Sequence, residues 1–561
     1  MQHTQDVRIA LVAGPGSTGL LRRLRDDGTP DGPAEQVGDL TAAVAAAEAA
    51  AEVRWVWRSG RVVYPRLLRS GIRVRRCHDA ELVGSLLRGR DASPEELDTA
   101  PGQHVPDLAG AGQAQLEFDS QAGDPSCELA ALLNLHASQQ TSIKADAAGP
   151  ARFALLAAAE SAGGLAAVEM SAAGLPWRAD VHDQLLTSLL GARPPMAAGP
   201  SLRPARLGEL VGEISAALGV NRPVNPDSPA QLRRALAAGG VRVPSTRSAV
   251  LRQVDHPVIP LLLEYKELAR LHAANGWSWL DAWVSGGRFR PEYVVGGVVS
   301  GRWASRGGGA LQIPRMLRRA VVADPGWVLV VADAAQLEPR VLAALAGDRS
   351  FGRAAAAGDV YAAVAEAIGS DRATAKVALL SAMYGGSGGD DHQSLALLRR
   401  RFPDAAAYVE NAARAGQEGR VVRSVLGRAC PPPTAAWREL TSESADPEAD
   451  RNPGAGAAAR ARGRFTRNFV VQASAADWAL VMLVALRTLL AAAHCSTPVP
   501  GSELVFFLHD EVIVHCPVSR QEQVVAAVEA AAAEATRLVF GPTEVSFPMT
   551  TSVVGCYADA K

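Results

Sequence analysis

Near the middle of the chain, the hydrophobic residues change within a few positions from an unbroken run, typical of a buried strand, to the spacing of one face of a helix. Val328 to Val331 is an unbroken, largely β-branched run, which predicts a buried strand that ends on Asp333. The next apolar residues fall on one face of a helix: Leu337, Val341, Leu342 and Leu345. A carboxylate at the end of a buried strand needs a cation or strong hydrogen-bond donors. Asp333 is therefore either an ordinary helix cap, for which Asp is favoured, or a functional acid.

A second pattern near the C-terminus has two apolar runs around a charged centre. Leu504–Leu508 and Val512–Val514 flank His509, Asp510 and Glu511, which predicts a β-hairpin with a charged tip. Tight hairpin turns usually carry Gly, Asn or Pro, and this tip has none of them. The segment is either an unusual surface hairpin or a site. If it lies beside the Asp333 strand, two aspartates converge, and paired carboxylates with substrate phosphates commonly hold Mg²⁺.

Two further segments place polar side chains at steps of four residues, which brings them onto one helical face. The first set is Arg372, Lys376, Leu380 and Tyr384, and the second is Arg464, Asn468 and Gln472. Arginine grips phosphate as a fork and lysine acts as a point charge, so the first set can hold a triphosphate. The alternative is an ordinary exposed polar face in each case. The scarcity of lysine, which occurs only at 144, 266, 376 and 561, favours a function for Lys376.

These segments resemble, in the same order, the motifs of family A DNA polymerases of the bacterial DNA polymerase I type. DAAQLEPR, Asp333–Arg340, resembles DYSQIELR, and LHDE, Leu508–Glu511, resembles VHDE. The segment from Val299, VSGRWAS, resembles the motif TGRLSS and contains Arg302. The resemblance is specific from about residue 150 onward, and we expect a large-fragment-like short form without a 5′-nuclease domain.

The resemblance implies that a primer 3′-hydroxyl attacks the α-phosphate of an incoming dNTP. It assigns catalysis to Asp333, Asp510 and Glu511, with two Mg²⁺ ions, or Mn²⁺, on the two aspartates. It assigns dNTP binding to Gln336, Glu338, Arg372, Lys376, Leu380 and Tyr384, with Glu338 excluding a 2′-hydroxyl. It assigns DNA binding to Arg302, Arg464, Asn468, Gln472 and His509. The chain departs from the family at Ala334–Ala335, Pro339 and Leu380, and these departures bear on its rate.

The first part of the chain alternates strand-like and helix-like pieces: Val7–Val12, Leu40–Ala51 and Arg54–Trp57. It resembles the RNase H-like 3′–5′ exonuclease domain of polymerase I, in which Asp79 would be the acid of the second motif. Asp79 can equally be a helix cap. The first and third motifs of that domain lack their acids here, and one acid cannot hold two metal ions. We therefore predict a degenerate, inactive exonuclease-like domain.

The predicted fold is an α/β exonuclease-like domain followed by an α+β right-hand polymerase domain with palm, fingers and thumb. Within it, Ser228 is expected to cap a thumb helix that stops at Gly239–Gly240, and Gly427–Arg428 matches a family turn in the fingers. The expected divisions are 1–150 exonuclease-like, 151–204 connecting helices, 205–300 thumb, 301–348 and 470–561 palm, and 349–469 fingers.

Composition limits the kinds of DNA site, metal site and cellular location that the chain can have. A formal net charge of −1 over 561 residues gives no global basic field, so a DNA site must be a local basic groove. Six cysteines without a Cys-x-x-Cys pair indicate neither a zinc site nor a disulfide framework, and fit a reducing cytosol. The N-terminal apolar run is too short for a signal peptide, and Trp478–Leu490 is expected to be a core helix. We expect a cytoplasmic, nucleoid-associated monomer that binds primer–template DNA and dNTPs.

The leading hypothesis is a DNA-directed DNA polymerase acting in DNA replication or repair by two-metal catalysis. One alternative is a catalytically weakened paralogue that only binds primer–template DNA. Another is a polymerase that keeps residual 3′–5′ exonuclease activity.

Overall fold

A computed structural model of the chain describes ten stretches of the sequence. They are residues 7–91, 124–146, 149–195, 203–220, 222–306, 312–356, 358–385, 392–442, 453–494 and 501–560. All the candidate site residues named above lie within these stretches.

The N-terminal part forms a five-stranded sheet in the order β3-β2-β1-β4-β5. Its strands are β1 (Val7–Ala13), β2 (Gly19–Leu24), β3 (Glu35–Val37), β4 (Val53–Trp57) and β5 (Arg76–Asp79). Strand β1 pairs in parallel with β4, and β4 in parallel with β5, whereas β2 and β3 add antiparallel pairs. The predicted α/β character of this part is confirmed, including both expected strands and the helix after Leu40.

Helices cover both faces of this sheet because its strands are apolar on both faces. Helices α1 (Leu40–Ala50) and α2 (Gly60–Arg69) pack with Leu11 and Trp55 on one face. The opposite face carries Ala10 and Val56 and packs against α5 (Pro125–Lys144). Helix α3 (Ala80–Asp91) follows directly after β5.

The chain then passes through α6 (Pro150–Ala173), β6 (Leu175–Pro176) and α7 (Ala179–Leu190). Within the expected connecting helices, α6 ends at Gly174, which has φ 72°. A side chain at Gly174 would place its Cβ 2.9 Å from the Cβ of Arg288, so β6 can pair closely with β8 (Arg288–Phe289) only because this residue is glycine.

The expected thumb is a helical projection whose core continues to the central sheet. It contains α8 (Ala205–Ala217), α9 (Pro229–Ala238), α10 (Ser248–Leu251) and α11 (Val258–Asn275), and α12 (Trp277–Trp283) follows at its base. Ser228 caps α9 by accepting a hydrogen bond from the N–H of Gln231, and the helix ends at Gly239 as predicted. Short strands β7 (Val284–Ser285), β9 (Glu292–Val294) and β10 (Ala304–Arg306) lead toward the central sheet.

The central sheet has four antiparallel strands in the order β12-β13-β11-β14. They are β11 (Trp327–Ala334), β12 (Glu503–Leu508), β13 (Glu511–Pro517) and β14 (Met549–Val554). Alternate residues face two different cores: Val330 and Val512 face the core shared with α20 and α21, and Leu329 and Ile513 face the core shared with the thumb base. The sheet is therefore buried on both faces and is a rigid support for its strand ends.

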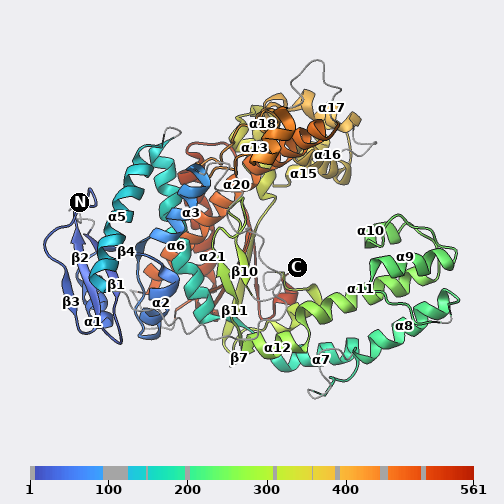
Figure 1. The fold of residues 1–561 in the computed structure, drawn as a ribbon, viewed down its shortest axis with the longest axis horizontal. Coiled ribbons are helices and arrows are strands. Elements are labelled where there is room, and N and C mark those ends of the chain that lie inside the picture. Colours follow the sequence, from blue (N-terminus) through green and yellow to red (C-terminus); the bar gives the residue numbers. More distant parts are fainter. Residues whose placement is uncertain are drawn as a thin grey trace.

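Helices form the expected fingers. They are α13 (Leu337–Ala346), at the edge of the palm, then α14 (Arg349–Ala356), α15 (Val360–Ile368), α16 (Arg372–Tyr384), α17 (His392–Arg401), α18 (Pro403–Gln417) and α19 (Ala435–Ser442). Figure 1 shows these helices and the thumb helices projecting to the same side of the central sheet, with the N-terminal domain on the opposite side. Helix α20 (Pro453–His494) runs without a break through residues 469 and 470, where fingers and palm were expected to meet, so both parts share it.

Helices α6 and α20 each contain an apolar stretch long enough to cross a membrane. Within the described residues, 61% and 78% of those stretches are buried inside the protein, and Trp478 and Leu490 belong to its main core. A core role accounts for both helices, as expected for Trp478–Leu490.

Candidate active site

Strand pairing brings the two acidic segments together. Asp333 on β11 lies directly opposite Glu511 on β13, and the N–H of Ala334 donates to the carbonyl of Asp510 at 3.0 Å. Asp333 does not cap the following helix, since the N-cap position of α13 is Gln336. The capping alternative for Asp333 is therefore wrong. The hairpin that carries Asp510 therefore lies beside the Asp333 strand, which was the condition for the two aspartates to converge.

Unusual backbone geometry marks both acidic segments. His509 (φ 58°) and Gln336 (φ 54°) are the two non-glycine residues with positive φ among those the structure describes. His509 forms the tight turn between β12 and β13 that lacks the usual turn residues, and Gln336 joins β11 to α13. Left-handed backbone in residues other than glycine costs free energy and is concentrated at functional sites. His509 directly precedes Asp510, and Gln336 lies three residues after Asp333.

The side chain of Glu511 is held by Tyr557, a residue that the sequence did not indicate. The Glu511 side chain is 5% exposed and accepts a 2.5 Å hydrogen bond from the hydroxyl of Tyr557. Burial and the charge of Glu511 raise the pKa of Tyr557, so the phenol stays protonated and keeps donating. No local pattern could reveal this pair, because 46 residues separate its members.

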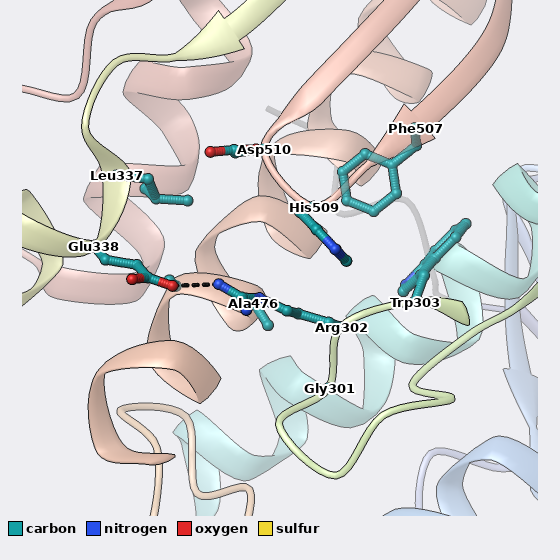
Figure 2. A pocket seen from close by; sticks show the side chains of 10 residues that line it. Gly301, Arg302, Trp303, Leu337, Glu338, Ala476, Phe507, His509 and Asp510 are labelled. Atoms are coloured by element: carbon teal, nitrogen blue, oxygen red, sulfur yellow. Dashed lines mark hydrogen bonds and ion pairs between the residues drawn. The ribbon is translucent and has the colours of Figure 1, made fainter. Parts of the chain in front are cut away.

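A cavity of about 200 Å³ lies between the hairpin tip and the start of α13. It is lined by Gly301, Arg302, Trp303, Leu337, Glu338, Ala475, Ala476, Phe507, His509 and Asp510. Figure 2 shows Asp510 on the Leu337 side of the hairpin and His509 between Phe507 and Arg302. Burial and the nearby charge of Arg302 lower the pKa of His509, and its buried Nδ1 makes no hydrogen bond within the described residues.

Arg302 and Glu338 form an ion pair across this cavity (Figure 2). Their side chains are only 28% and 16% exposed. Burial raises the pKa of Glu338, while the adjacent guanidinium of Arg302 opposes that shift. Arg302, which is expected at the primer end, and Glu338, which is expected at the sugar, are therefore paired with each other in this structure.

Helix α16 carries the predicted phosphate-binding face. Arg372 and Lys376 are exposed, and each lies over the ring of Tyr361 at 5.7 Å. Leu380 and Tyr384 are half-buried further along the same helix. The predicted single helix with these residues at steps of four is confirmed.

Asp359, which the sequence did not single out, positions this face. The Nε of Arg372 donates to its Oδ2 at 2.6 Å, and the amide of Gln336 donates to its Oδ1 at 2.8 Å. Although burial opposes the shift, hydrogen bonds from Arg372 and Gln336 lower the pKa of Asp359 to about 2. Gln336 also accepts from the N–H of Val360 at 2.7 Å. Its predicted contact with dNTP stays a prediction, and its side chain here connects α13 to the start of α15.

The polar residues of α20 face the end of α16. Arg464 is exposed, whereas Asn468 and Gln472 are half-buried, and the buried Oδ1 of Asn468 has no hydrogen bond within the described residues. A Cβ added to Gly385, at the C-terminal end of α16, would lie 3.3 Å from the Cγ of Arg464. The two predicted binding faces therefore meet at Gly385.

Arg428, expected only as part of a turn in the fingers, also packs against the segment that carries Arg302. It is 8% exposed and forms ion pairs with Glu160 at 2.5 Å and Asp477 at 3.3 Å. Its guanidinium lies against Gly301, where φ is 86° and an added Cβ would clash with the Nε of Arg428. Only glycine fits there, so Arg428 fixes the turn that presents Arg302.

The donor set suits a hard cation. Among the described residues there is no group of three or more His, Cys, Asp or Glu side chains that could hold a metal ion by itself. Asp333 and Asp510 nevertheless supply two carboxylates at adjacent strand ends, and Glu511 is engaged by Tyr557. Mg²⁺ is usually held by one or two carboxylates together with substrate phosphates, so these residues fit that ion.

Asp79 has the geometry of a helix cap. Its Oδ1 accepts from the N–H groups of Glu81 and Leu82, both at 3.1 Å, at the start of α3. Its Oδ2 accepts from the N–H of Gly60 at 2.7 Å, at the start of α2. One buried carboxyl thus satisfies two helix N-termini, which accounts for Asp79 without a nuclease role.

Burial of this carboxyl leads to a prediction about pH. Burial raises the pKa of Asp79 from 3.8 to about 6, so the folded state binds the proton more tightly than the unfolded state. Its stabilising contribution is therefore full below about pH 4 and is lost as the pH rises through about 6. Between these limits we expect the free energy of unfolding to fall by about 3 kcal/mol more in the parent than in Asp79→Asn. Urea unfolding at each pH measures this, and parallel curves would contradict it.

Known proteins resemble this chain over its polymerase-like part. A model described as DNA polymerase family A matches residues 203–553. Thermostable DNA polymerase I of Thermus filiformis is 28% identical over 307 residues, or 49% of this chain and 34% of that protein. DNA polymerase I of Chloroflexus aurantiacus is 26% identical over 319 residues, or 51% of this chain and 31% of that protein. The matched segment thus spans about a third of the length of these relatives.

A solved structure is similar over the whole chain. The POL domain of Pol1 from M. smegmatis, in complex with DNA primer-template and dNTP, aligns with a TM-score of 0.68 and 19% identity. The alignment covers 100% of this chain and 96% of that one. The predicted polymerase-domain fold is therefore confirmed.

Proposed function

Because the chain belongs to DNA polymerase family A, we propose that it is a DNA-directed DNA polymerase that extends a primer 3′-hydroxyl with nucleotides from dNTPs. The observation that carries this proposal is the pairing of β11 and β13, which brings Asp333 next to the turn that carries Asp510, and Asp510 and Glu338 line one cavity. The basic face of α16 supplies charges suited to a triphosphate.

Asp333 and Asp510 are the residues proposed to hold two Mg²⁺ ions, with Mn²⁺ as a substitute. When bound, such ions neutralise charge on the attacking and leaving oxygens of a phosphoryl transfer. Glu511 adds negative charge behind Asp333, and its bond to Tyr557 supports a positioning role rather than direct coordination. This assignment rests on the chemistry of the donors and on the family.

The other residues bind and orient the substrates. Arg372 and Lys376 are proposed to hold the triphosphate, with Leu380 and Tyr384 beside the nucleoside. Leu380 offers no ring for stacking, in contrast to the family pattern. His509 and Arg302 are proposed to hold the primer end. Arg464, Asn468 and Gln472 are proposed to contact the template, where amides suit the sequence-independent acceptors of the minor groove.

A primer-extension assay tests the proposal. We expect the protein to extend a labelled primer with all four dNTPs and Mg²⁺, and to stop when the metal is chelated. Binding of primer–template DNA without extension under any divalent cation would instead support the DNA-binding paralogue.

Sugar selection depends on Glu338. Replacing Glu338 with Ala should raise ribonucleotide incorporation relative to deoxyribonucleotide, because the side chain is proposed to occupy the position of a 2′-hydroxyl. Arg302→Met is the matched control, since it also breaks the Arg302–Glu338 pair but leaves the carboxylate in place. The ratio of kcat/KM values for the two sugars measures the effect. An equal loss of discrimination in both variants would show that the ion pair, rather than the carboxylate, is responsible.

The N-terminal domain is proposed to have no proofreading activity. A mismatched, end-labelled primer should keep its length when incubated with Mg²⁺ and without dNTPs, because two-metal hydrolysis needs several convergent carboxylates. The capping bonds of Asp79 support this proposal. Primer shortening that disappears in Asp79→Ala would demonstrate a live exonuclease and overturn it.

A further inference from the structure

The end of the central sheet carries two carboxylates on the same face. Side chains alternate between the faces along a strand, and Val331 and Ile513 belong to the core shared with the thumb base. Asp333 and Glu511 each lie two residues from one of these, and they are opposite each other in the β11–β13 register. Like charges in directly opposite positions repel, and their side chains are close enough to share one cation. Strand geometry alone therefore offers a hard cation Glu511 as well as Asp333.

Tyr557 engages one of these two carboxylates. Its hydroxyl donates a 2.5 Å hydrogen bond to the Oε1 of Glu511, and the two residues are 1% and 5% exposed. A hydrogen bond to a charged carboxylate is strong, and at this depth water does not readily replace the phenol. Within the described part of the chain, no group of three His, Cys, Asp or Glu side chains is arranged to hold a metal ion. The bond to Tyr557 therefore separates Glu511 from the acids proposed to hold the ions.

The ring of Tyr557 is fixed on several sides. The N–H of Tyr557 donates to the carbonyl of Val321 at 3.0 Å, and its side chain belongs to the core shared with the thumb base. The guanidinium carbon of Arg318 lies 4.4 Å from the centre of the ring, which is within the range of a cation–π contact. The hydroxyl is therefore held in place to keep Glu511 in one position.

We propose that Tyr557 is a positioning residue that keeps Glu511 out of metal coordination, so that Asp333 and Asp510 are the acids that bind the ions. This inference rests on the proposed polymerase function and deepens it, because it names the residue that sets the metal affinity of that site. Mg²⁺ is usually held by one or two carboxylates together with substrate phosphates, and the number of charged ligands tunes the affinity of such oxygen sites for cations. By removing one carboxylate, Tyr557 makes metal binding depend more on the substrate.

A purely structural role for the same hydrogen bond predicts a different result. The bond also offsets the repulsion between Glu511 and Asp333, so its loss is expected to destabilise the palm in either case. If the bond only stabilises the fold, its loss leaves the metal affinity unchanged or weakens it. If the bond restrains Glu511, its loss strengthens metal binding, because the released carboxylate becomes a ligand. The direction of the change in metal affinity therefore separates the two roles.

Binding of Mn²⁺ to the protein without DNA or dNTP measures that direction. Electron paramagnetic resonance gives the concentration of free Mn²⁺, and hence a Kd that does not depend on activity. The variants are Tyr557→Phe, Glu511→Gln and the two combined. Tyr64→Phe is the matched control, since the buried hydroxyl of Tyr64 also donates a 2.5 Å hydrogen bond to a glutamate, Glu169, whose side chain is 9% exposed. That pair joins α2 to α6 in another part of the molecule.

We expect Tyr557→Phe to bind Mn²⁺ about tenfold more tightly than the parent, since hydrogen bonds to charged groups contribute free energies of that order. The same substitution in the Glu511→Gln background should leave the Kd unchanged, because the amide has no charge to offer the ion. Tyr64→Phe should bind Mn²⁺ as the parent does. The Mg²⁺ concentration that gives half-maximal primer extension should also fall in Tyr557→Phe. Misfolding does not produce tighter binding of a metal ion.

A second variant keeps the test independent of the stability of Tyr557→Phe. With para-aminophenylalanine in place of Tyr557, the ring is kept and its amine is a weaker donor than the phenol. This protein should bind Mn²⁺ with an affinity between those of the parent and Tyr557→Phe. Urea unfolding curves establish that each variant is folded under the conditions of the binding assay.

Other outcomes overturn the inference. Unchanged or weaker Mn²⁺ binding by the folded Tyr557 variants would remove Tyr557 from this role, and so would equal tightening in the Glu511→Gln background. Both results leave primer extension by the parent intact. If Asp333→Ala and Asp510→Ala bind Mn²⁺ as tightly as the parent, or if the parent extends no primer, the proposed metal site or the proposed polymerase function is refuted instead. The two failures are therefore distinguishable.

Discussion

Replacing Asp333 or Asp510 with alanine is expected to abolish primer extension, with a fall in rate of at least about 10³-fold. Each substitution removes one of the two carboxylates that β11 and β13 bring together, and loss of metal-ion catalysis costs several kcal/mol of transition-state stabilisation. DNA affinity should change little, because it comes mainly from phosphate contacts elsewhere. Single-turnover extension and an equilibrium binding assay on the same preparations separate the two effects.

Two controls make this result specific to the two aspartates. Asp559→Ala removes an exposed acid two residues after Tyr557 and should extend at the parental rate. Glu511→Gln retains an acceptor for Tyr557, so we expect a smaller loss than at either aspartate. Extension at near the parental rate by Asp333→Ala or Asp510→Ala would refute the assignment.

The sequence predicted the parts of the site that depend on local order. The change of period after Val331 located β11 and α13, and the charged residues between two apolar runs located the β12–β13 hairpin. The steps of four in α16 and α20 were visible because a helix repeats its face at that spacing. The adjacency of Asp333 and Asp510 was conditional on strand order, which the sequence suggested only through the family resemblance.

The parts that the sequence did not reveal are pairs of residues far apart in the chain. Tyr557 and Glu511 are 46 residues apart, and Arg428 and Glu160 are 268 residues apart. Such pairs are defined by packing and leave no periodic signal. For Asp79 the sequence pattern was present but ambiguous. The residue stands where the family has a catalytic acid, yet its carboxylate accepts hydrogen bonds at the starts of both α2 and α3.

Arg428→Met is expected to destabilise the protein by about 3–5 kcal/mol, because it leaves Glu160 and Asp477 buried without a counter-charge. These carboxylates are 2% and 0% exposed, so water cannot replace the guanidinium. Extension should also slow, since the guanidinium lies against Gly301 and fixes the turn that presents Arg302. Urea unfolding measures the first effect, and KM for primer–template DNA measures the second.

A triple variant separates the two roles of Arg428. Combining Arg428→Met with Glu160→Gln and Asp477→Asn removes the uncompensated charges, so most of the stability should return. The support beneath Gly301 would still be missing, and the raised KM for primer–template DNA should therefore persist. If KM recovers together with stability, the effect on Arg302 is an indirect result of misfolding. If Arg428→Met alone is as stable as the parent, the buried charges are compensated by other groups. The persistent KM defect in a stable protein is the outcome that makes Arg428 a positioning residue for Arg302.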